Sequence, residues 1–170
     1  VYVGNSKILV AYRSTGNSNY GTAVVGTVVG TGITFGTAVV FKAGAIYYIT
    51  TTYDSINDKV VIAYRDQSNF DRGECAVGTV VGTGVTFPST PVLIENTAAP
   101  GPAAYMSSTY DSTNGKVVIA YSDNGNGTRG TALVATVSGT RISYGYKAVF
   151  ETAAVAYELC TVDYTNGKVC

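Results

Sequence analysis

The chain has 170 residues, of which 11 are basic and 11 acidic, and it contains no histidine and no tryptophan. This length fits one domain, and the zero net charge excludes a binder of nucleic acids or of acidic membranes, which would need a surplus of Lys and Arg. The 46 % of hydrophobic residues argues against disorder, and the absence of histidine excludes serine triads and histidine-bound zinc.

A repeat organises the chain. Four lysines, separated by 52, 57 and 52 residues, mark its period: Lys7, Lys59, Lys116 and Lys168. The first three begin similar apolar segments, KILVAYRS, KVVIAYRD and KVVIAYSD. We therefore expect one repeat domain over residues 1–170, with units at about 1–45, 46–102 and 103–154 and a partial unit at 155–170. The middle unit is five residues longer, and we expect its extra residues to form an exposed loop within 94–103.

Each unit is predicted to contain four strands. In the middle unit, β-branched and aromatic residues indicate a first strand at Tyr47–Asp54. After a polar turn, a second strand at Lys59–Arg65 has a continuous apolar centre, which is typical of a strand covered on both faces. Equivalent second strands are expected near 7–13 and 116–122.

The second half of the middle unit continues the pattern. A third strand is expected at Glu74–Val81 and, after a glycine turn, a fourth at Val85–Ile94. Pro88 and Pro91 place the fourth strand at an exposed edge, because proline has no N–H to donate to a neighbour.

The predicted fold is all-β. Four antiparallel strands in each 50 or so residues are typical of a β-propeller blade, so the chain is expected to hold about three four-stranded blades. Closed propellers have about four to eight blades, so we expect a longer or multi-chain propeller. The main alternative is a β-solenoid, whose coils repeat at shorter periods and pair in parallel. A two-sheet sandwich is weaker, because it requires no regular repeat.

Two aromatic–arginine pairs end the second strands and are candidates for ligand binding. They are Tyr12–Arg13 and Tyr64–Arg65, and the third unit has Tyr121 followed by a serine. In sugar-binding propellers such rings stack on sugar C–H surfaces while arginine binds hydroxyls. Because side chains alternate along a strand, each tyrosine and its arginine point to opposite faces. Packing of the tyrosines between units therefore stays open as the alternative.

Polar side chains recur just after the second strands. Asp66 and Asp123 end these strands, and Asn69 and Asn126 follow three residues later. Loop oxygens of this kind suit a sugar or a calcium ion, whereas Asp and Asn are also ordinary turn formers that bind nearby backbone amides. Ser14 replaces the aspartate in the first unit, so we predict turn chemistry, no metal and no cofactor.

The acidic residues indicate no catalytic pair. Glycoside hydrolysis would need two carboxylates across a pocket, and the glutamates do not recur in register: Glu74, Glu95, Glu151 and Glu158. No nucleophile elbow or phosphate-binding glycine loop is present. We therefore expect no enzyme and assign no catalytic residue.

Two of the three cysteines fall in one expected hairpin. Cys160 and Cys170 lie symmetrically about Thr165, the expected centre of the last turn, so they are predicted to face each other. Directly opposed residues are close to disulfide geometry. Two free thiols remain the alternative, and Cys75 is expected to be free.

The repeat resembles a known family. The segments Tyr53-Asp54-Ser55, Lys59–Asp66 and Gly21–Phe35 resemble repeats of tail-fibre and other surface proteins of marine bacteriophages and of some aquatic bacteria, and the strand pattern is similar to the YVTN class of propeller. The resemblance implies a virion or extracellular, cell-surface location, and a structural or host-recognition (adhesin) role.

Three functions follow from these observations. The first is a non-enzymatic module that scaffolds a surface appendage or contacts a receptor. The second is a carbohydrate-binding lectin, and the third is an accessory domain of an extracellular hydrolase. The expected partners are a cell-surface glycan or receptor, and other copies or further repeats of the same protein. Neither nucleic acid nor membrane insertion is expected, because no apolar run reaches the roughly 18 residues of a membrane span.

Overall fold

Antiparallel strands form nearly all of the regular structure. The computed structural model describes residues 1–94, 102–156, 160, 162–163 and 168–169. Strands make up 67 % of it, and two short 3-10 turns, η1 (Gln67–Asn69) and η2 (Asn124–Asn126), are the other regular elements in these ranges. No helix in the described ranges has the length and apolar character needed to cross a bilayer. The prediction of an all-β protein is confirmed.

The strands follow the repeat. The first unit contains β1 (Lys7–Ser14), β2 (Tyr20–Val29), β3 (Gly32–Phe35) and the first part of β4 (Val39–Asp54). The second contains the rest of β4, β5 (Lys59–Asp66), β6 (Arg72–Val81), β7 (Gly84–Thr86) and β8 (Val92–Leu93). The third contains β9 (Ala103–Asp111), β10 (Lys116–Asp123), β11 (Arg129–Ser138), β12 (Arg141–Tyr144) and β13 (Ala148–Ala154). The hairpin of β14 (Val162–Asp163) and β15 (Lys168–Val169) follows.

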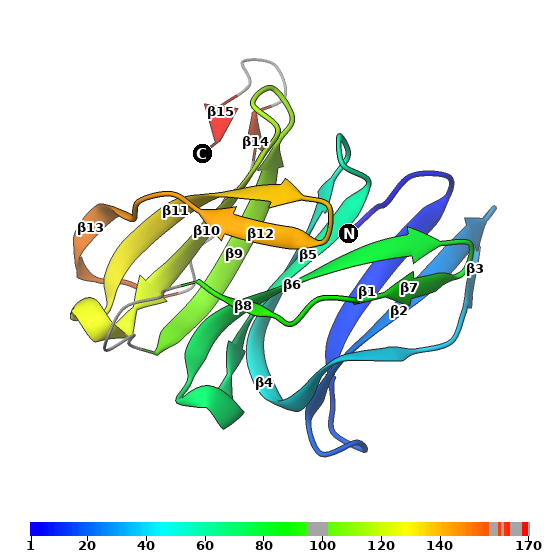
Figure 1. Cartoon of the computed structure of the whole chain (residues 1–170), viewed down its shortest axis with the longest axis horizontal. Helices are drawn as coiled ribbons and strands as arrows, with labels where there is room; N and C mark the ends of the chain where they lie inside the picture. The colour runs from blue at the N-terminus through cyan, green and yellow to red at the C-terminus, as the bar shows by residue number, and fades with distance from the viewer. Residues whose placement is uncertain (95–101, 157–159, 161, 164–167, 170) are drawn as a thin grey trace.

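Each unit is an antiparallel meander in which the third strand pairs with both segments that follow it: β2 with β3 and β4, β6 with β7 and β8, and β11 with β12 and β13. The three units lie side by side in chain order (Figure 1). The second strands, β1, β5 and β10, occupy the three predicted positions. β4 joins two units, because it pairs with β2 as far as Ala45 and with β5 from Ile46 onward. Every pair among the described strands is antiparallel, so the parallel pairing required by the solenoid alternative is wrong.

Two details of the predicted units need correction. The fourth strand is not continuous in any of the three units: it breaks between β3 and β4, between β7 and β8 and between β12 and β13, and only the middle break contains prolines, Pro88 and Pro91. The expected loop at 94–103 is also not exposed at its ends, because Ile94 and Ala103 are buried in the core. Residues 95–101 lie outside the described part of the chain.

The hairpin between first and second strand is set by a repeated aspartate. Asp54 accepts hydrogen bonds from the backbone amides of Ile56 and Asn57 and from the Asn57 side chain. Asp111 does the same with Thr113 and Asn114 in the third unit. The recurring Tyr-Asp-Ser motif is therefore a turn motif, which satisfies backbone donors that the four-residue turn leaves unpaired.

The core lies between units. β5 presents alternate residues to its two neighbours: Val60, Ile62 and Tyr64 pack on the first unit, while Val61 and Ala63 pack on the third. All five side chains are fully buried. The second strand is thus covered on both faces, as its continuous apolar sequence predicts.

Gly36 offers a test of this packing. It follows β3, and a Cβ atom at this position would lie 2.0 Å from the backbone oxygen of Thr83 in the second unit. We expect Gly36→Ala to lower the free energy of unfolding by about 1–3 kcal/mol, since a backbone atom cannot move aside cheaply. Gly16→Ala is the control, because its Cβ would enter open space. Urea denaturation measures both, and equal stability of the two variants would contradict the contact.

Candidate functional site

The first strands of the second and third units are distorted at equivalent tyrosines. Tyr48 in β4 and Tyr105 in β9 both have φ = +50°, a left-handed conformation that is unusual for a large side chain. The strand register shifts at the same places. Strain of this kind occurs at functional sites more often than elsewhere, and a bulge re-aims the side chain that it carries.

Aromatic rings and guanidinium groups gather around these bulges. The Tyr48 and Tyr105 rings are 4.8 Å apart between centroids. The Arg13 guanidinium lies 4.4 Å from the centroid of the Tyr47 ring, and that of Arg65 lies 5.6 Å from the Tyr48 ring. Tyr47 and Tyr48 are both partly exposed to solvent. We call these five residues the arginine–tyrosine surface: it is assembled from all three units.

Its two arginines differ in how they are neutralised. Arg65 forms two contacts of 2.8 Å with the Asp71 carboxylate, and the hydrogen bond to Asp71 raises the pKa of Arg65. Arg13 forms no ion pair with a described residue. Its guanidinium can therefore still bind an acceptor on a ligand while it stacks on Tyr47.

A charged cluster adjoins this surface, because Asp66 follows Arg65. Lys42 of the first unit lies 2.5 Å from the Asp66 carboxylate and 2.9 Å from that of Glu74, and both acids are buried. Glu74 also accepts hydrogen bonds from the Tyr64 hydroxyl and the Asn69 amide. The two buried carboxylates thus share one cation and accept hydrogen bonds inside the protein, which is a structural arrangement.

The pKa values in this cluster follow from burial and charge. Burial alone would lower the pKa of Lys42, but its hydrogen bonds and attraction to Asp66 and Glu74 outweigh burial and raise it. For Asp66, burial opposes the charged form, and the hydrogen bonds from Lys42 and Ser68 outweigh it, so its pKa is lowered. Burial, followed by the negative charge of Glu74, raises the pKa of Tyr64 far above its usual value.

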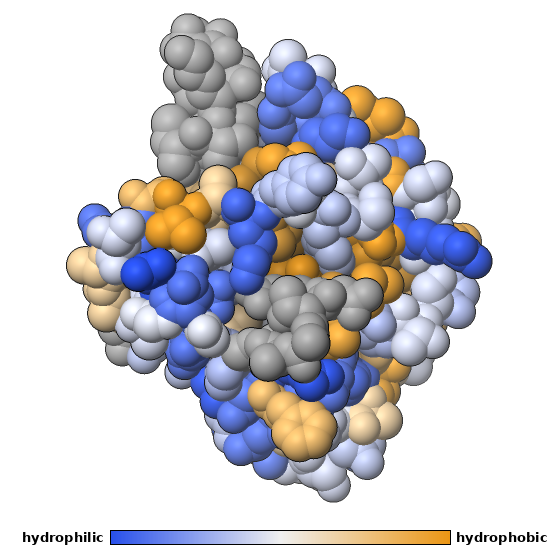
Figure 2. Space-filling view, turned by 60° about the vertical axis from the view of Figure 1, so that its left-hand side comes forward, coloured by the Kyte–Doolittle hydropathy of each residue, from blue (hydrophilic) through white to orange (hydrophobic). Residues whose placement is uncertain are grey.

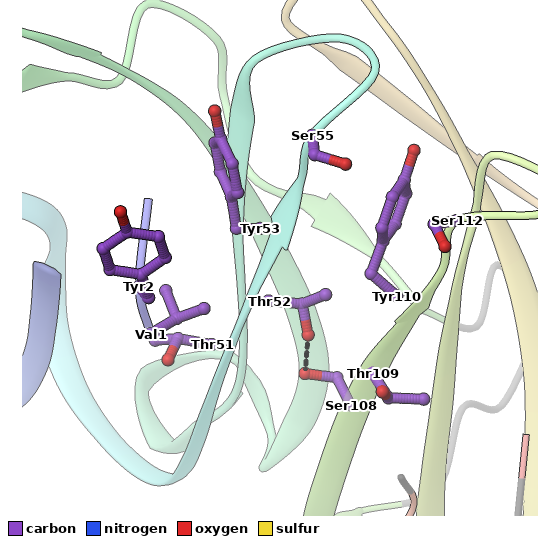
Figure 3. Close-up of a pocket in the computed structure, with 10 residues that line it drawn as sticks. All are labelled: Val1, Tyr2, Thr51, Thr52, Tyr53, Ser55, Ser108, Thr109, Tyr110 and Ser112. Carbon is purple, nitrogen blue, oxygen red and sulfur yellow. Dashed lines mark hydrogen bonds between the residues drawn. The ribbon is translucent and has the colours of Figure 1, made fainter. Parts of the chain in front are cut away.

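A pocket of about 420 Å³ opens at the other end of the first strands (Figure 3). Tyr2, Tyr53 and Tyr110 line it, and their strand partners Ile8, Val60 and Val117 are equivalent in the repeat. Val1 and a set of hydroxyl side chains line the rest: Thr51, Thr52, Ser55, Ser108, Thr109 and Ser112. Burial and nearby aspartates raise the pKa of Tyr53 and of Tyr110 to about 12. The pocket therefore offers the Tyr53 and Tyr110 phenols in their neutral form, together with several hydroxyl groups.

The tyrosines predicted from the second strands mostly pack inside. Tyr64 and Tyr121 are fully buried between units, whereas the equivalent Tyr12 is partly exposed, because none of the described residues covers the outer face of the first unit. Of the predicted aromatic–arginine pairs, only Arg13 and Arg65 join the surface described above. Their aromatic partners come from the first strands instead.

The polar loop residues form turns and ion pairs. Asp66 caps η1 by accepting hydrogen bonds from the Ser68 amide and hydroxyl. Asp123 makes no such cap and pairs with Lys147 at 3.0 Å. Asn126 accepts a long hydrogen bond of 3.4 Å from Arg129. In the part of the chain that the structure describes, no three acids and cysteines are grouped as metal ligands would be.

The register predicted for the last hairpin is off by one residue. Asp163 pairs with Lys168 rather than with Gly167, so the paired aspartate and lysine are separated in sequence as Asp54 and Lys59, and Asp111 and Lys116, are. Cys160 forms no disulfide with a described residue, and its Sγ lies 3.5 Å from the Ser107 hydroxyl. Cys170 lies outside the described residues, so the disulfide stays a prediction. Cys75 is free and buried, and burial raises its pKa to about 12.

Sequence reasoning missed Tyr47, Tyr48 and Tyr105. Their signal was present, because Tyr48 and Tyr105 stand 57 residues apart, which is the repeat period there. The β-bulge changes the direction in which these side chains point, and the sequence does not show where a bulge occurs. Regular alternation along a strand therefore did not predict that the tyrosines lie beside arginines of other strands. No protein-family model matches this chain, and no curated protein sequence matches it significantly.

Lys42 tests the charged cluster. Lys42→Met leaves two buried carboxylates without their cation, so we expect the free energy of unfolding to fall by about 3–5 kcal/mol. Lys7→Met removes the same charge where no described acid is paired with it, and should change stability by less than about 1 kcal/mol. Urea denaturation at neutral pH compares them. Equal losses would show that the cluster does not depend on Lys42.

The same cluster predicts a pH dependence. The lowered pKa of Asp66 gives stability that is present above its unfolded value of 3.8 and is lost as the pH falls through the lower folded value. The raised pKa of Lys42 gives stability that is present below 10.5 and is lost as the pH rises through the higher folded value. Without Lys42, only the Ser68 hydrogen bonds oppose burial, so the pKa of Asp66 is higher than in the wild type. Lys42→Met, although less stable at neutral pH, should therefore lose less stability than the wild type as the pH falls. Denaturation from neutral pH to below 3.8 measures this, and coincident profiles would contradict it.

The left-handed conformation of Tyr48 makes a further prediction. Tyr48→Gly should be more stable than Tyr48→Ala by about 1 kcal/mol, because only glycine adopts this conformation without strain. At Tyr53, in the same strand and without a positive φ, alanine should be the more stable variant. Thermal denaturation of the four variants gives both orders. Alanine ahead of glycine at both positions would show that the fold does not impose the bulge.

Proposed function

We propose that this chain is a non-enzymatic binding module made of β-propeller-type blades, and that it contacts a receptor through the arginine–tyrosine surface. Three features support the blade architecture. Each unit is an antiparallel meander, the middle unit is buried on both faces, and the first strands β4 and β9 lie next to each other, linked by hydrogen bonds of Thr50 and Thr52 to Ser108. This arrangement suits sheets that radiate from a shared axis.

The observation that carries the binding role is the arginine–tyrosine surface. It combines partly exposed rings, the Arg13 guanidinium, which has no ionic partner among the described residues, and two strained tyrosines at equivalent positions. A structural site would be expected to bury or neutralise these groups, as the Lys42 cluster does. Aromatic and arginine side chains are also the ones that contribute most to binding interfaces.

The resemblance to tail-fibre repeats suggests the setting. A receptor-contacting module of a phage tail fibre, or of a similar surface appendage, needs a rigid scaffold that presents a few anchor residues outside the cell. The buried interfaces between units supply such a scaffold. The binding surface then lies where the first strands begin, beside η1 and the connection between units.

A glycan is the second candidate for the receptor, favoured by the chemistry of Arg13 and Tyr47. A partly exposed phenol ring can stack on the apolar face of a sugar, and a stacked guanidinium with free donors can bind hydroxyls or a carboxylate. The ligand class is the one predicted from the sequence, but the aromatic residues that would bind it lie in the first strands instead of the second.

Binding measurements test the proposal. The labelled chain is applied to a glycan array and to envelope fractions of aquatic bacteria, which are treated with either protease or periodate to separate protein from glycan receptors. We expect saturable binding that Tyr47→Ala or Arg13→Ala weakens by roughly tenfold or more, which corresponds to about 1.4 kcal/mol. Tyr146→Ala is the control, because Tyr146 is fully exposed and makes no contact with this surface. Binding that survives both substitutions would exclude this surface as the site.

A further inference from the structure

Two sheet faces at opposite ends of the molecule expose aromatic side chains. On the outer face of the first unit, Tyr12 is 37 % and Phe35 55 % exposed. On the outer face of the third unit, Phe150 is 57 % exposed, and Val134 is exposed near it. Apolar surface is visible between hydrophilic side chains on the side of the molecule that carries β13 (Figure 2). Neither face is covered by another unit among the described residues.

The residues at the equivalent repeat positions of the other units contact one another in the interior of the molecule. Phe41 is the equivalent of Phe150, and it is only 7 % exposed. Its ring lies 5.3 Å from that of Tyr64 and 5.6 Å from that of Phe87, measured between centroids. Tyr64 and Phe87 are the equivalents of Tyr12 and Phe35. The two exposed faces therefore carry the two halves of an aromatic contact that the first and second units already make.

We propose that a second copy of this chain docks the outer face of its first unit on the outer face of the third unit. Phe150 then meets Tyr12 and Phe35 of the second copy, as Phe41 meets Tyr64 and Phe87 within one chain. Charge does not oppose this contact, because Glu151 takes the position of Lys42 and faces the hydroxyl residues Ser14 and Thr22 instead of two acids. The contact joins different surfaces, so it continues until a ring or a filament forms.

The last hairpin shows where the docked unit fits. β14 and β15 contact β9, and the Cys160 amide donates a hydrogen bond to the Ser107 hydroxyl. The hairpin therefore begins to cover the inner part of the third unit and leaves Val134 and Phe150 exposed. Lys168–Val169 occupies the repeat positions of Lys7–Ile8. The docked β1 accordingly displaces β15, a strand of two residues.

Complementation of two variants tests the proposal. Tyr12→Glu spoils one face and Phe150→Glu spoils the other, so each variant alone should lose self-association by roughly 30-fold or more. An equimolar mixture should form a 1:1 dimer and nothing larger, because each variant keeps one intact face. Sedimentation velocity over a range of concentrations measures all three samples and the wild type, which should form species larger than a dimer. Circular dichroism and the melting temperature confirm that the variants fold.

The control is Phe70→Glu, which changes an exposed aromatic residue on the η1 loop, away from both faces, and should associate like the wild type. Association of either Tyr12→Glu or Phe150→Glu by itself would indicate a symmetric contact through the remaining face and overturn the proposal. A wild-type chain that stays monomeric at all concentrations would also overturn it, as would a mixture that does not dimerise. None of these results depends on whether a receptor binds the arginine–tyrosine surface.

Discussion

Burial of sheet faces between neighbouring units is the interaction on which the rest of the structure depends. A sheet of four short strands cannot bury its own apolar faces, so each unit is stable only against the next. β5 illustrates the consequence, since its alternate residues belong to two different cores. The turns, the register and the placement of the first strands all follow from keeping these faces in contact.

That scaffold explains how strained tyrosines can persist at the surface. A left-handed tyrosine costs free energy that a loop would recover by relaxing, but Tyr48 and Tyr105 lie in strands paired along most of their length. Packing of the units therefore fixes the rings beside arginines from other strands. A site made in this way is rigid before a partner arrives, so little conformational entropy is lost on binding.

The sequence predicted the all-β class, the antiparallel pairing and the positions of the second strands, because these depend on local apolar patterns and on a regular repeat. It did not predict the arginine–tyrosine surface. A β-bulge adds one residue to a strand, so period-two reasoning fails beyond Tyr47, and which arginine reaches which ring depends on how units are placed. The charged cluster was equally hidden, since Lys42, Asp66 and Glu74 come from different strands and only one of them recurs. The last register was missed by one residue because the turn was centred on Thr165 instead of being matched to the earlier hairpins.

The position that Lys42 occupies is held by a different kind of residue in every unit: lysine in the first, Ile94 in the second and Glu151 in the third. Only the lysine places a cation against Asp66 and Glu74 of the second unit. If another unit were placed beside that surface during folding, two buried carboxylates would face either an isoleucine or a third acid. Near-identical repeats are at risk of stacking in the wrong order. Because of this single variable position, the correct stacking of the first two units has a lower free energy than a wrong one. A wrong stacking would bury the two carboxylates without their cation even where its apolar surfaces fit.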